Sequence, residues 1–438
     1  MNNLAKLSRK KGVQELQQNQ HNHRFGSFIF LMLFLMALLL NQSSVIFNIN
    51  ISLSDVFLLI IFIMMLLKKI INIPRIFFLF VIMLSFVVIF TSFFINPLRF
   101  GVQVDPVLVF GDYIKLLAVF LYFIVGYNLS SEGLITKVLK WFSFGSVCIG
   151  IIAIISSFIE IPSIQETFYY SESRFRGLMN DPNYFSIIQS SAMMYFFSNI
   201  DIKKRYKIFA LFILTFSIFI SGSKTGMILL ILIYSYKLLS VFFSEKKNSK
   251  QLLSLLTVLI FVGLFMMIFY FLYDGILNRV DQTFPVFGRV EQLFTDFDGA
   301  VSSSGSVREM AWSNAINLIK LSPIFGIGLG TYSNLASSLF GSQTIAHNTY
   351  LQIAVEWGIV MSLVFICSIF YQLVKVSFQS YKDGKLVRNM LIPILVGSFS
   401  LSLNNARIFW LLLGALAYCV SLKEKTDLKR LKTNNRQS

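Results

Sequence analysis

Charged residues, histidine and cysteine are all scarce in this sequence. Of its 438 residues, 13% are charged, three are histidine and three are cysteine. The cysteines, Cys148, Cys367 and Cys419, lie in apolar runs, so the sequence offers neither an outer disulfide framework nor a CxxC metal site. With so little charge, a soluble domain of this length could not cover its surface, and that class of protein is excluded.

Long apolar runs take the place of the missing charge. Hydrophobic residues make up 55% of the chain, and the mean hydropathy is +0.70. The runs are long enough to cross a hydrocarbon layer of about 30 Å and lack the period-two alternation of barrel strands, so they predict helices. We expect an all-α integral membrane protein with about twelve transmembrane helices. Their expected bounds are 25–40, 53–67, 76–95, 107–127, 141–159, 184–199, 208–221, 225–243, 251–273, 350–374, 391–404 and 408–421.

The distribution of Lys and Arg predicts the orientation of these helices. If the N-terminus lies inside, most of the 38 basic residues fall in inner segments, as the positive-inside rule requires. Both termini are then cytoplasmic, and the net charge of +17 implies no nucleic-acid partner. The first apolar run lacks a small-residue cleavage site, so we expect it to remain as a helix.

One polar interruption, residues 274–349, is longer than the other outer loops. Its SVRE sequence at 306–309 and the helical spacing of the apolar residues after it predict an amphipathic helix that ends near Pro323. We expect this helix to lie on the membrane surface or to cap the bundle. The FGIGLGTY sequence that follows has no preceding strand, so it predicts a flexible linker rather than a nucleotide-binding loop.

The chain therefore divides into membrane helices, one large loop and two tails. A disordered cytoplasmic tail (1–24) precedes membrane helices one to nine (25–273). The large extracytoplasmic loop (274–349) precedes helices ten to twelve (350–422), and a second cytoplasmic tail follows (423–438). Both tails are polar and charged, which favours disorder.

A minority of basic residues break the orientation rule, because they are expected on the outer side of the membrane. Arg174 and Arg176 lie in SRFRGLMNDPNYF, and Lys224 lies in SGSKTG, at the turn between two apolar runs. Arg308 lies in the amphipathic helix, and Arg407 lies between the last two membrane helices. Guanidinium groups bind phosphate oxygens in a bidentate manner, so these residues suit a pyrophosphate carried on a membrane lipid.

These stretches together resemble the O-antigen polymerase and O-antigen ligase superfamily of bacterial envelope glycosyltransferases. The resemblance rests on the order of RFRGLMNDPNYF, SGSKTG, VREMAWSNAINLIKLSPIFGIGLGTYSN and AHNTYLQIAVEWG, which extend with the last basic turn from Arg174 to Arg407. The family usually has arginine at the position of Lys224. The lysine keeps the positive charge but cannot bind a phosphate in the bidentate manner of arginine.

The resemblance implies a substrate class and a location. The substrate would be a glycan on undecaprenyl pyrophosphate, met at the outer face of the cytoplasmic (inner) membrane among its lipids. The resemblance also implies that no cofactor, metal ion or nucleotide sugar takes part. A chain-length regulator and a flippase are the protein partners that such a system suggests.

His347, which opens the sequence HNTYLQIAVEWG, is the expected catalytic residue. A neutral imidazole can accept a proton from an acceptor hydroxyl or orient it. The alternative is a histidine that caps a helix or lies at the membrane interface, and the outer location and the resemblance favour catalysis. Arg174, Arg176, Lys224, Arg308 and Arg407 are then expected to bind the pyrophosphate, and Trp312 and Asn348 to contact the glycan.

Two acidic residues in the helices have structural explanations. Asp112 and Lys115 are one helical turn apart and predict an ion pair. Glu356 lies about 180° around an ideal helix from His347 and shares a face with Gln352, which favours packing or internal hydrogen bonding over a catalytic pair.

Three functions remain open. The leading one is a polymerase that moves a growing glycan from one lipid pyrophosphate onto the next lipid-linked repeat unit. The alternative within the family is a ligase that transfers the finished glycan to another acceptor. A transporter of the lipid-linked glycan is the least supported, because no internal repeat is evident and the charged residues lie mostly at the outer ends of the expected helices.

Overall fold

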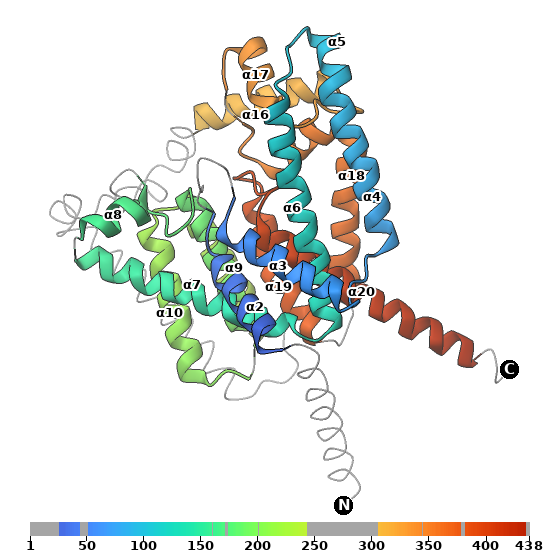
Figure 1. Cartoon of the computed structure of the whole chain (residues 1–438). Coiled ribbons are helices and arrows are strands. Elements are labelled where there is room, and N and C mark those ends of the chain that lie inside the picture. Colours follow the sequence, from blue (N-terminus) through green and yellow to red (C-terminus); the bar gives the residue numbers. More distant parts are fainter. Residues whose placement is uncertain are drawn as a thin grey trace, which may run out of the picture.

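The protein, described here by a computed structural model, is built almost entirely of helices (Figure 1). The structure describes residues 26–43, 51–159, 161–170, 174–199, 201–242, 305–343, 345–377 and 382–434. Its first helices are α2 (Ser27–Leu39), α3 (Leu53–Leu67), α4 (Arg75–Phe90), the π-helix η1 (Thr91–Ile95), α5 (Asn96–Phe100), α6 (Pro106–Ser131), α7 (Ile135–Phe158), α8 (Pro162–Phe168), α9 (Pro182–Ser198), α10 (Lys204–Ile220) and α11 (Lys224–Phe242). The later helices are α16 (Gly305–Leu321), α17 (Tyr332–Phe340), α18 (Thr349–Ser377), α19 (Lys382–Gly397) and α20 (Arg407–Asn434). Two short strands, β1 (Tyr169–Tyr170) and β2 (Arg174–Phe175), pair antiparallel between α8 and α9.

The predicted class, an all-α integral membrane protein, is confirmed. Each expected membrane helix in the described part of the chain overlaps an observed helix, whereas the one expected at 251–273 lies outside the described residues. The helical segments long and apolar enough to cross a membrane are Arg75–Phe100, Pro106–Ser131, Ile135–Phe158 and Thr349–Ser377. Shorter apolar helices lie at Ser27–Leu39, Leu53–Leu67 and Arg407–Leu422. The number of about twelve crossings stays a prediction.

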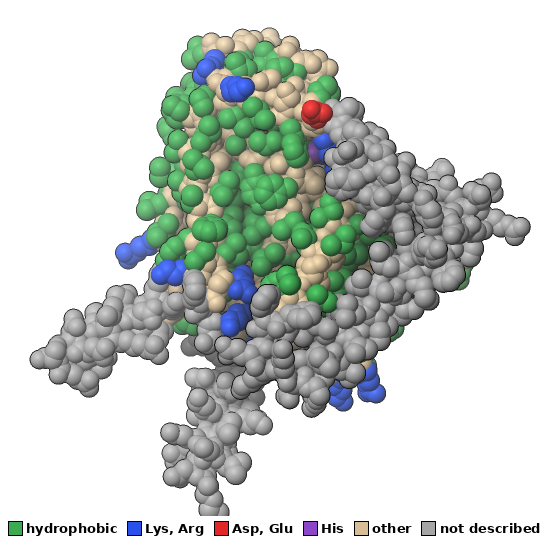
Figure 2. Space-filling view, turned by 180° about the vertical axis from the view of Figure 1, so that it is seen from behind, with side chains coloured by type: hydrophobic (Ala, Val, Ile, Leu, Met, Phe, Trp, Pro, Cys, Tyr) green, Lys and Arg blue, Asp and Glu red, His purple; other side chains and the backbone are tan. Residues whose placement is uncertain are grey.

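The outer surface of the helices is apolar, as contact with lipid requires. On α4 and α5, Ile76 and Leu98 are 85% and 88% exposed, although water would oppose such exposure of large aliphatic side chains. Figure 2 shows apolar side chains over much of one face, with several Lys and Arg side chains toward its lower end. This pattern is that of a bundle whose lateral surface faces hydrocarbon.

Two glycines allow α6 and α20 to pack closely. A Cβ atom on Gly126 would lie 2.2 Å from the carbonyl oxygen of Leu411, and one on Gly414 would lie 1.9 Å from that of Phe123. Small residues permit such close approach of helices in membranes, where packing replaces the hydrophobic effect as the source of association. The contact fixes the start of α20, and therefore Arg407, beside the core.

The last two helices differ most from the prediction. The helix expected at 391–404 is α19, which begins at Lys382 and ends at Gly397, because its first turns are amphipathic and bury Leu386 and Val387 below exposed lysines. Hydropathy alone misses such turns. α20 continues to Asn434, through most of the segment predicted to be a disordered tail; residues 423–434 contain neither Gly nor Pro and are rich in helix formers.

The FGIGLG segment is a tightly packed connection, and the prediction of a flexible linker is wrong. Its backbone pairs with that of α18, where Ile327 N donates to Val355 O at 2.8 Å. On the other side, Leu329 N donates to the Ser92 hydroxyl at 2.8 Å, and that hydroxyl donates to Leu329 O at 3.0 Å. Ser92 lies in η1, whose wide turn receives the segment. The segment therefore ties α4 to α18.

Glycine is required at three positions of this segment for two reasons. Gly326, Gly328 and Gly330 have φ values of +70°, +70° and +69°, which favour glycine. A Cβ atom on Gly328 would also lie 2.2 Å from the Ser92 hydroxyl oxygen. Three alternating glycines thus have a packing explanation that needs no nucleotide.

α16, in the large loop, ends at Leu321, close to the predicted end near Pro323. It packs against α18 and α17, with Ala311, Ala315 and Leu318 fully buried. Of the two predicted placements, capping the bundle therefore fits the structure (Figure 1). The part of this loop at 274–304 lies outside the described residues.

Candidate functional site

The SGSKTG turn lies against two other segments at one end of the bundle. The Ser223 hydroxyl donates to the Asn183 side chain at 2.8 Å, which joins the turn to the start of α9. The Thr225 hydroxyl donates to the Ser400 hydroxyl at 2.9 Å, which joins it to the loop between α19 and α20. Two of the family-like motifs, remote in sequence, are therefore adjacent in space.

The start of α18 is tied to the same loop. Thr349 N donates to Ser398 O at 2.8 Å, and Leu403 N donates to the Thr349 hydroxyl at 2.8 Å. Asn348 is buried, and its side-chain oxygen accepts from Tyr350 N at 2.9 Å, so it caps α18. The predicted glycan contact through Asn348 stays a prediction, and the cap already accounts for an asparagine here.

His347 precedes this cap in an unusual backbone conformation. Its φ is +46°, in the left-handed region that a non-glycine residue rarely occupies. Such conformations concentrate at functional sites, where the surrounding structure holds the strain. The cap of α18, made by Asn348, fixes the backbone directly after His347.

The charges around His347 favour its neutral form. Burial lowers the pKa of His347 below its ordinary value of 6.5, the Arg308 guanidinium lowers it further, and the Asp181 carboxylate opposes them. At neutral pH the ring is therefore mostly unprotonated and able to accept a proton. Arg308 and Asp181 come from α16 and from the turn before α9, so three separate segments meet at this histidine.

Trp312 lies one turn after Arg308 on α16. The two positions are four residues apart and share a face of the helix. Trp312 is 39% exposed, and Arg308 is partly exposed. An indole beside a guanidinium on an accessible helix face is compatible with the predicted glycan and phosphate contacts, which stay predictions.

The β1–β2 hairpin brings Arg174 to the SGSKTG turn. The Arg174 Nε donates to Ser221 O at 3.3 Å, three residues before Lys224, which begins α11. Arg176 N donates to Phe168 O at 2.8 Å, and its Nε is buried without a hydrogen-bond partner among the described residues. Arg174 is therefore held against the turn that carries Lys224.

Arg407 is held by an acidic side chain inside the bundle. Its Nε donates to Asp55 Oδ1 at 2.7 Å and its Nη2 to Asp55 Oδ2 at 2.7 Å. The Tyr122 hydroxyl also donates to Asp55, at 2.9 Å. The Arg407 and Asp55 side chains are only 11% and 16% exposed. The sequence predicted that the Arg407 guanidinium binds a phosphate in this bidentate manner, and in the structure it binds the Asp55 carboxylate instead.

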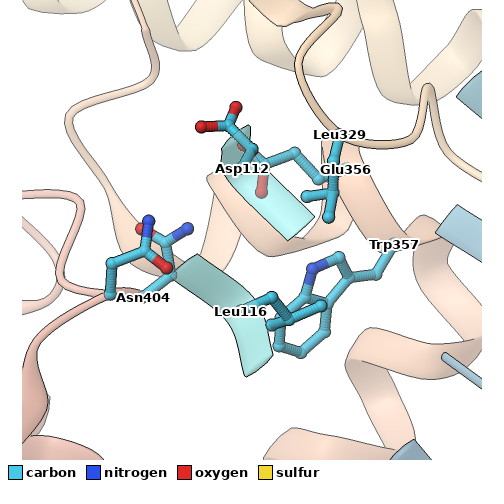
Figure 3. A pocket seen from close by; sticks show the side chains of 7 residues that line it. Asp112, Leu116, Leu329, Glu356, Trp357 and Asn404 are labelled. Atoms are coloured by element: carbon cyan, nitrogen blue, oxygen red, sulfur yellow. The ribbon is translucent and has the colours of Figure 1, made fainter. Parts of the chain in front are cut away.

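A pocket that the sequence did not reveal lies between α6, α18 and the α19–α20 loop (Figure 3). We call it the Glu356 pocket; it holds about 270 Å³ of empty space, part of it open to solvent. Its lining residues are Asp112, Leu116, Leu329, Glu356, Trp357, Asn404 and Asn405. They come from four stretches of the chain, and the sequence carried no signal of their convergence beyond a carboxylate within each of two apolar helices.

Both predicted roles of the acidic helix residues are confirmed. Asp112 forms an ion pair with Lys115 at 2.8 Å. Glu356 is buried, and its carboxylate accepts a hydrogen bond from the Gln352 side chain, one turn earlier on the same face of α18.

Comparison with family models gives a match. A family model described as O-Antigen ligase matches residues 209–366, which include Lys224, Arg308 and His347. No curated protein matches the chain. The matched segment thus contains His347, the nearby Arg308 and the lysine of the SGSKTG turn.

Proposed function

Because the chain belongs to the O-antigen ligase and polymerase superfamily, we propose that it is a polysaccharide polymerase of the cytoplasmic membrane. The polymerase joins repeat units carried on undecaprenyl pyrophosphate at the outer face of this membrane, as part of an O-antigen, capsular or exopolysaccharide system. Both termini are cytoplasmic in this proposal, and the segments around His347 face outward. The observation that carries it is the convergence of a neutral, backbone-strained histidine with Arg308 and the Asp181 turn.

His347 acts on the acceptor in this reaction. Its unprotonated ring nitrogen accepts the proton of the acceptor hydroxyl as that oxygen forms a bond to the anomeric carbon of the donor sugar. The bond between the anomeric carbon and the pyrophosphate oxygen breaks, and the pair of electrons leaves with the pyrophosphate. Burial of the ring and the nearby Arg308 both keep it in the form that this step needs.

Basic residues act on the leaving group. Arg308 lies near His347, and Arg174 lies against the turn that carries Lys224, so positive charge borders the site from α16 and from the β1–β2 hairpin. Such charge stabilises the developing negative charge on pyrophosphate. Arg176 belongs to the same hairpin segment and is proposed as a further ligand. Arg407, already paired with Asp55, is proposed to support the site from within the bundle.

A ligase is the second candidate, because the matching family model is described as O-Antigen ligase. A ligase would use the same residues to move a finished glycan onto a different acceptor, in one transfer per chain. The geometry around His347 serves either reaction, since both transfer a glycan from lipid pyrophosphate to a hydroxyl.

Deletion of the gene separates these functions. Loss of a polymerase leaves single repeat units on the final acceptor, whereas loss of a ligase leaves full-length polymer on the carrier lipid. The purified protein in lipid vesicles, supplied with lipid-linked repeat units, should lengthen the glycan. If it moves the substrate across the vesicle membrane and never changes its length, the protein is a transporter and the proposal is wrong.

A further inference from the structure

A buried hydrogen-bond donor of the Glu356 pocket has no partner among the described residues. The Trp357 indole N–H belongs to a side chain that is 1% exposed, and it has no hydrogen-bond partner in the part of the chain that the structure describes. The Tyr332 hydroxyl is likewise buried and unpartnered within the described residues. Buried donors of this kind are rare in proteins, because each one left unpaired costs free energy. They indicate that a ligand or ordered water completes the site.

The same pocket contains acceptors. Figure 3 shows the Asp112 and Glu356 carboxylates, the Asn404 amide and the indole nitrogen of Trp357 around one open space. The side-chain amides of Asn404 and Asn405 form no hydrogen bond with another described residue. Burial raises the pKa of the Tyr332 phenol, and the Glu356 carboxylate raises it further. Asn405 is exposed, so the pocket is reached from its side.

The mixture of donors and acceptors selects the class of ligand. A metal cation needs acceptors alone, and the indole N–H and the Lys115 ammonium beside Asp112 oppose it. An anion needs donors alone, and two carboxylates oppose it. A sugar hydroxyl both donates and accepts, so it satisfies an indole N–H, an amide and a carboxylate together. Leu116 and Leu329 add the apolar surface that the C–H groups of a sugar ring require.

We propose that the Glu356 pocket is a glycan subsite, which binds hydroxyl groups of one sugar of the lipid-linked glycan. The inference rests on the proposed glycosyl transfer. Its empty space of about 270 Å³ includes space open to solvent, so the enclosed part is smaller and receives only the edge of one ring. Glu356 lies nine residues after His347, about 13 Å along a helix, so this sugar is not the one at the reacting bond.

The subsite supplies binding energy at a distance from the chemistry. Two substitutions test it without touching His347 or the basic residues. Trp357→Phe keeps an aromatic ring and removes the N–H, and Asn404→Ala removes the amide. Trp141→Phe is the matched control, because Trp141, in α7, packs edge-to-face on Phe34, in α2, and does not line the pocket. Asn199→Ala, at the opposite end of α9 from Asn183, is the control for the amide.

The substrate is the repeat unit on undecaprenyl pyrophosphate isolated from the same cells, and the readout is the rate of transfer by the full chain in vesicles. We expect each pocket variant to raise KM about 2- to 10-fold, the effect of one lost hydrogen bond, with kcat changed less than twofold. The controls should leave both constants unchanged. Unchanged KM in both pocket variants would overturn the inference, as would a fall in kcat accompanied by a lower melting temperature, which would mark a structural role.

A binding measurement separates this inference from the proposed function. In His347→Ala protein, which cannot turn over the substrate, Trp357→Phe should weaken binding of the same lipid-linked repeat unit by a similar factor. Should wild-type protein make no product while this binding still depends on Trp357, the proposed transfer fails and the subsite stands. Should wild-type protein be active while binding ignores Trp357 and Asn404, the subsite fails and the proposed transfer stands.

Discussion

His347 has a strained backbone conformation and a lowered pKa, and both properties fit a residue that accepts a proton. Its φ of +46° is held by the cap of α18, and burial together with Arg308 lowers its pKa. A histidine that only capped the helix would need neither property, because the side chain of Asn348 already provides the cap.

Replacement of His347 should therefore remove activity and leave the fold intact. In His347→Ala no ring nitrogen remains, and the rate of transfer should fall by a factor of about 10² to 10⁴, the usual cost of losing a general base. His347→Gln can keep a hydrogen bond but cannot accept the proton, so it should keep only weak activity. Glycan ladders on gels, read at equal protein level, measure the effect. Chains of normal length from His347→Ala would reduce the residue to a structural one.

The pH dependence of the rate should report the charges next to His347. Because its pKa is lowered, the active neutral form should persist to below pH 6.5 and be lost as pH falls through that lowered pKa. The Asp181 carboxylate raises the pKa, so Asp181→Asn should lower it further and move the acid limb to lower pH. Asparagine still caps α9, where Asp181 accepts from Asn183 N at 2.7 Å. Asp201→Asn, at an exposed ion pair with Lys382, is the control and should not move the limb.

Arg407 and Asp55 should behave as a pair in stability. Removal of one partner from a buried ion pair leaves an unpaired charge and costs about 3 to 5 kcal/mol. Arg407→Ala and Asp55→Ala should each lower the melting temperature and the protein level, and the double variant should be less destabilised than the sum of the two. Arg176→Ala should instead keep the protein level and lose product. Stable Arg407→Ala protein with lost product would return Arg407 to the phosphate site.

At the scale of elements, the FGIGLG segment joins α4, α6 and α18 through positions that exclude side chains. A Cβ atom on Gly330 would lie 2.5 Å from the backbone nitrogen of Val109 in α6. Ser92 in η1 excludes a Cβ atom on Gly328 in the same way. Since Leu329 of this segment also lines the Glu356 pocket, the packing of the segment sets the shape of that pocket.

Two glycines with nearly the same φ allow the cost of overpacking to be measured separately from the cost of backbone strain. Gly328 has φ +70° and a closed environment, whereas Gly341, after α17, has φ +67° and nothing within 4 Å of a built Cβ atom. Gly341→Ala should cost about 1 to 2 kcal/mol, the price of the left-handed conformation alone. Gly328→Ala adds overpacking and should cost about 2 to 5 kcal/mol in total. Melting temperatures in detergent measure both, and equal losses would mean that the segment yields to the new methyl group.

Helices were predictable here, and the connections between them were not. Apolar length alone located α2, α3, α6 and α18 within a few residues, because hydrocarbon demands continuous apolar helices. The FGIGLG segment was misjudged because glycine permits a flexible chain and a closely packed one equally well. What decides between them is Ser92, more than 230 residues earlier, and no local pattern reports such a partner.

At the scale of the whole molecule, the same limit applies to the site. Chemistry and position brought attention to His347 and Arg308, which the fold places near enough for the guanidinium to lower the pKa of the imidazole, and the roles of both stay predictions. The sequence could not assign Arg407, because its partner Asp55 lies 352 residues away and the preference of arginine for a carboxylate or a phosphate is the same. The Glu356 pocket was out of reach for a similar reason, since it needs α6, α18 and the α19–α20 loop together.

The orientation of the molecule makes the last prediction. α19 spans Lys382–Gly397, about 24 Å as a helix, and its first two turns contain Lys382, Lys385 and Arg388. The loop after it contains Ser398 and Ser400, which hydrogen-bond to the segments of the candidate site. If the site faces outward, a reporter active only outside the cytoplasm should work when fused near Ser400 or near Gly305 and fail when fused near Asp383. Fusions at Ser400 and Asp383 differ by one helix, so each controls for the expression of the other. Equal activity at both would mean that α19 does not cross the membrane, and the reverse pattern would place His347 in the cytoplasm, away from any substrate presented at the outer face.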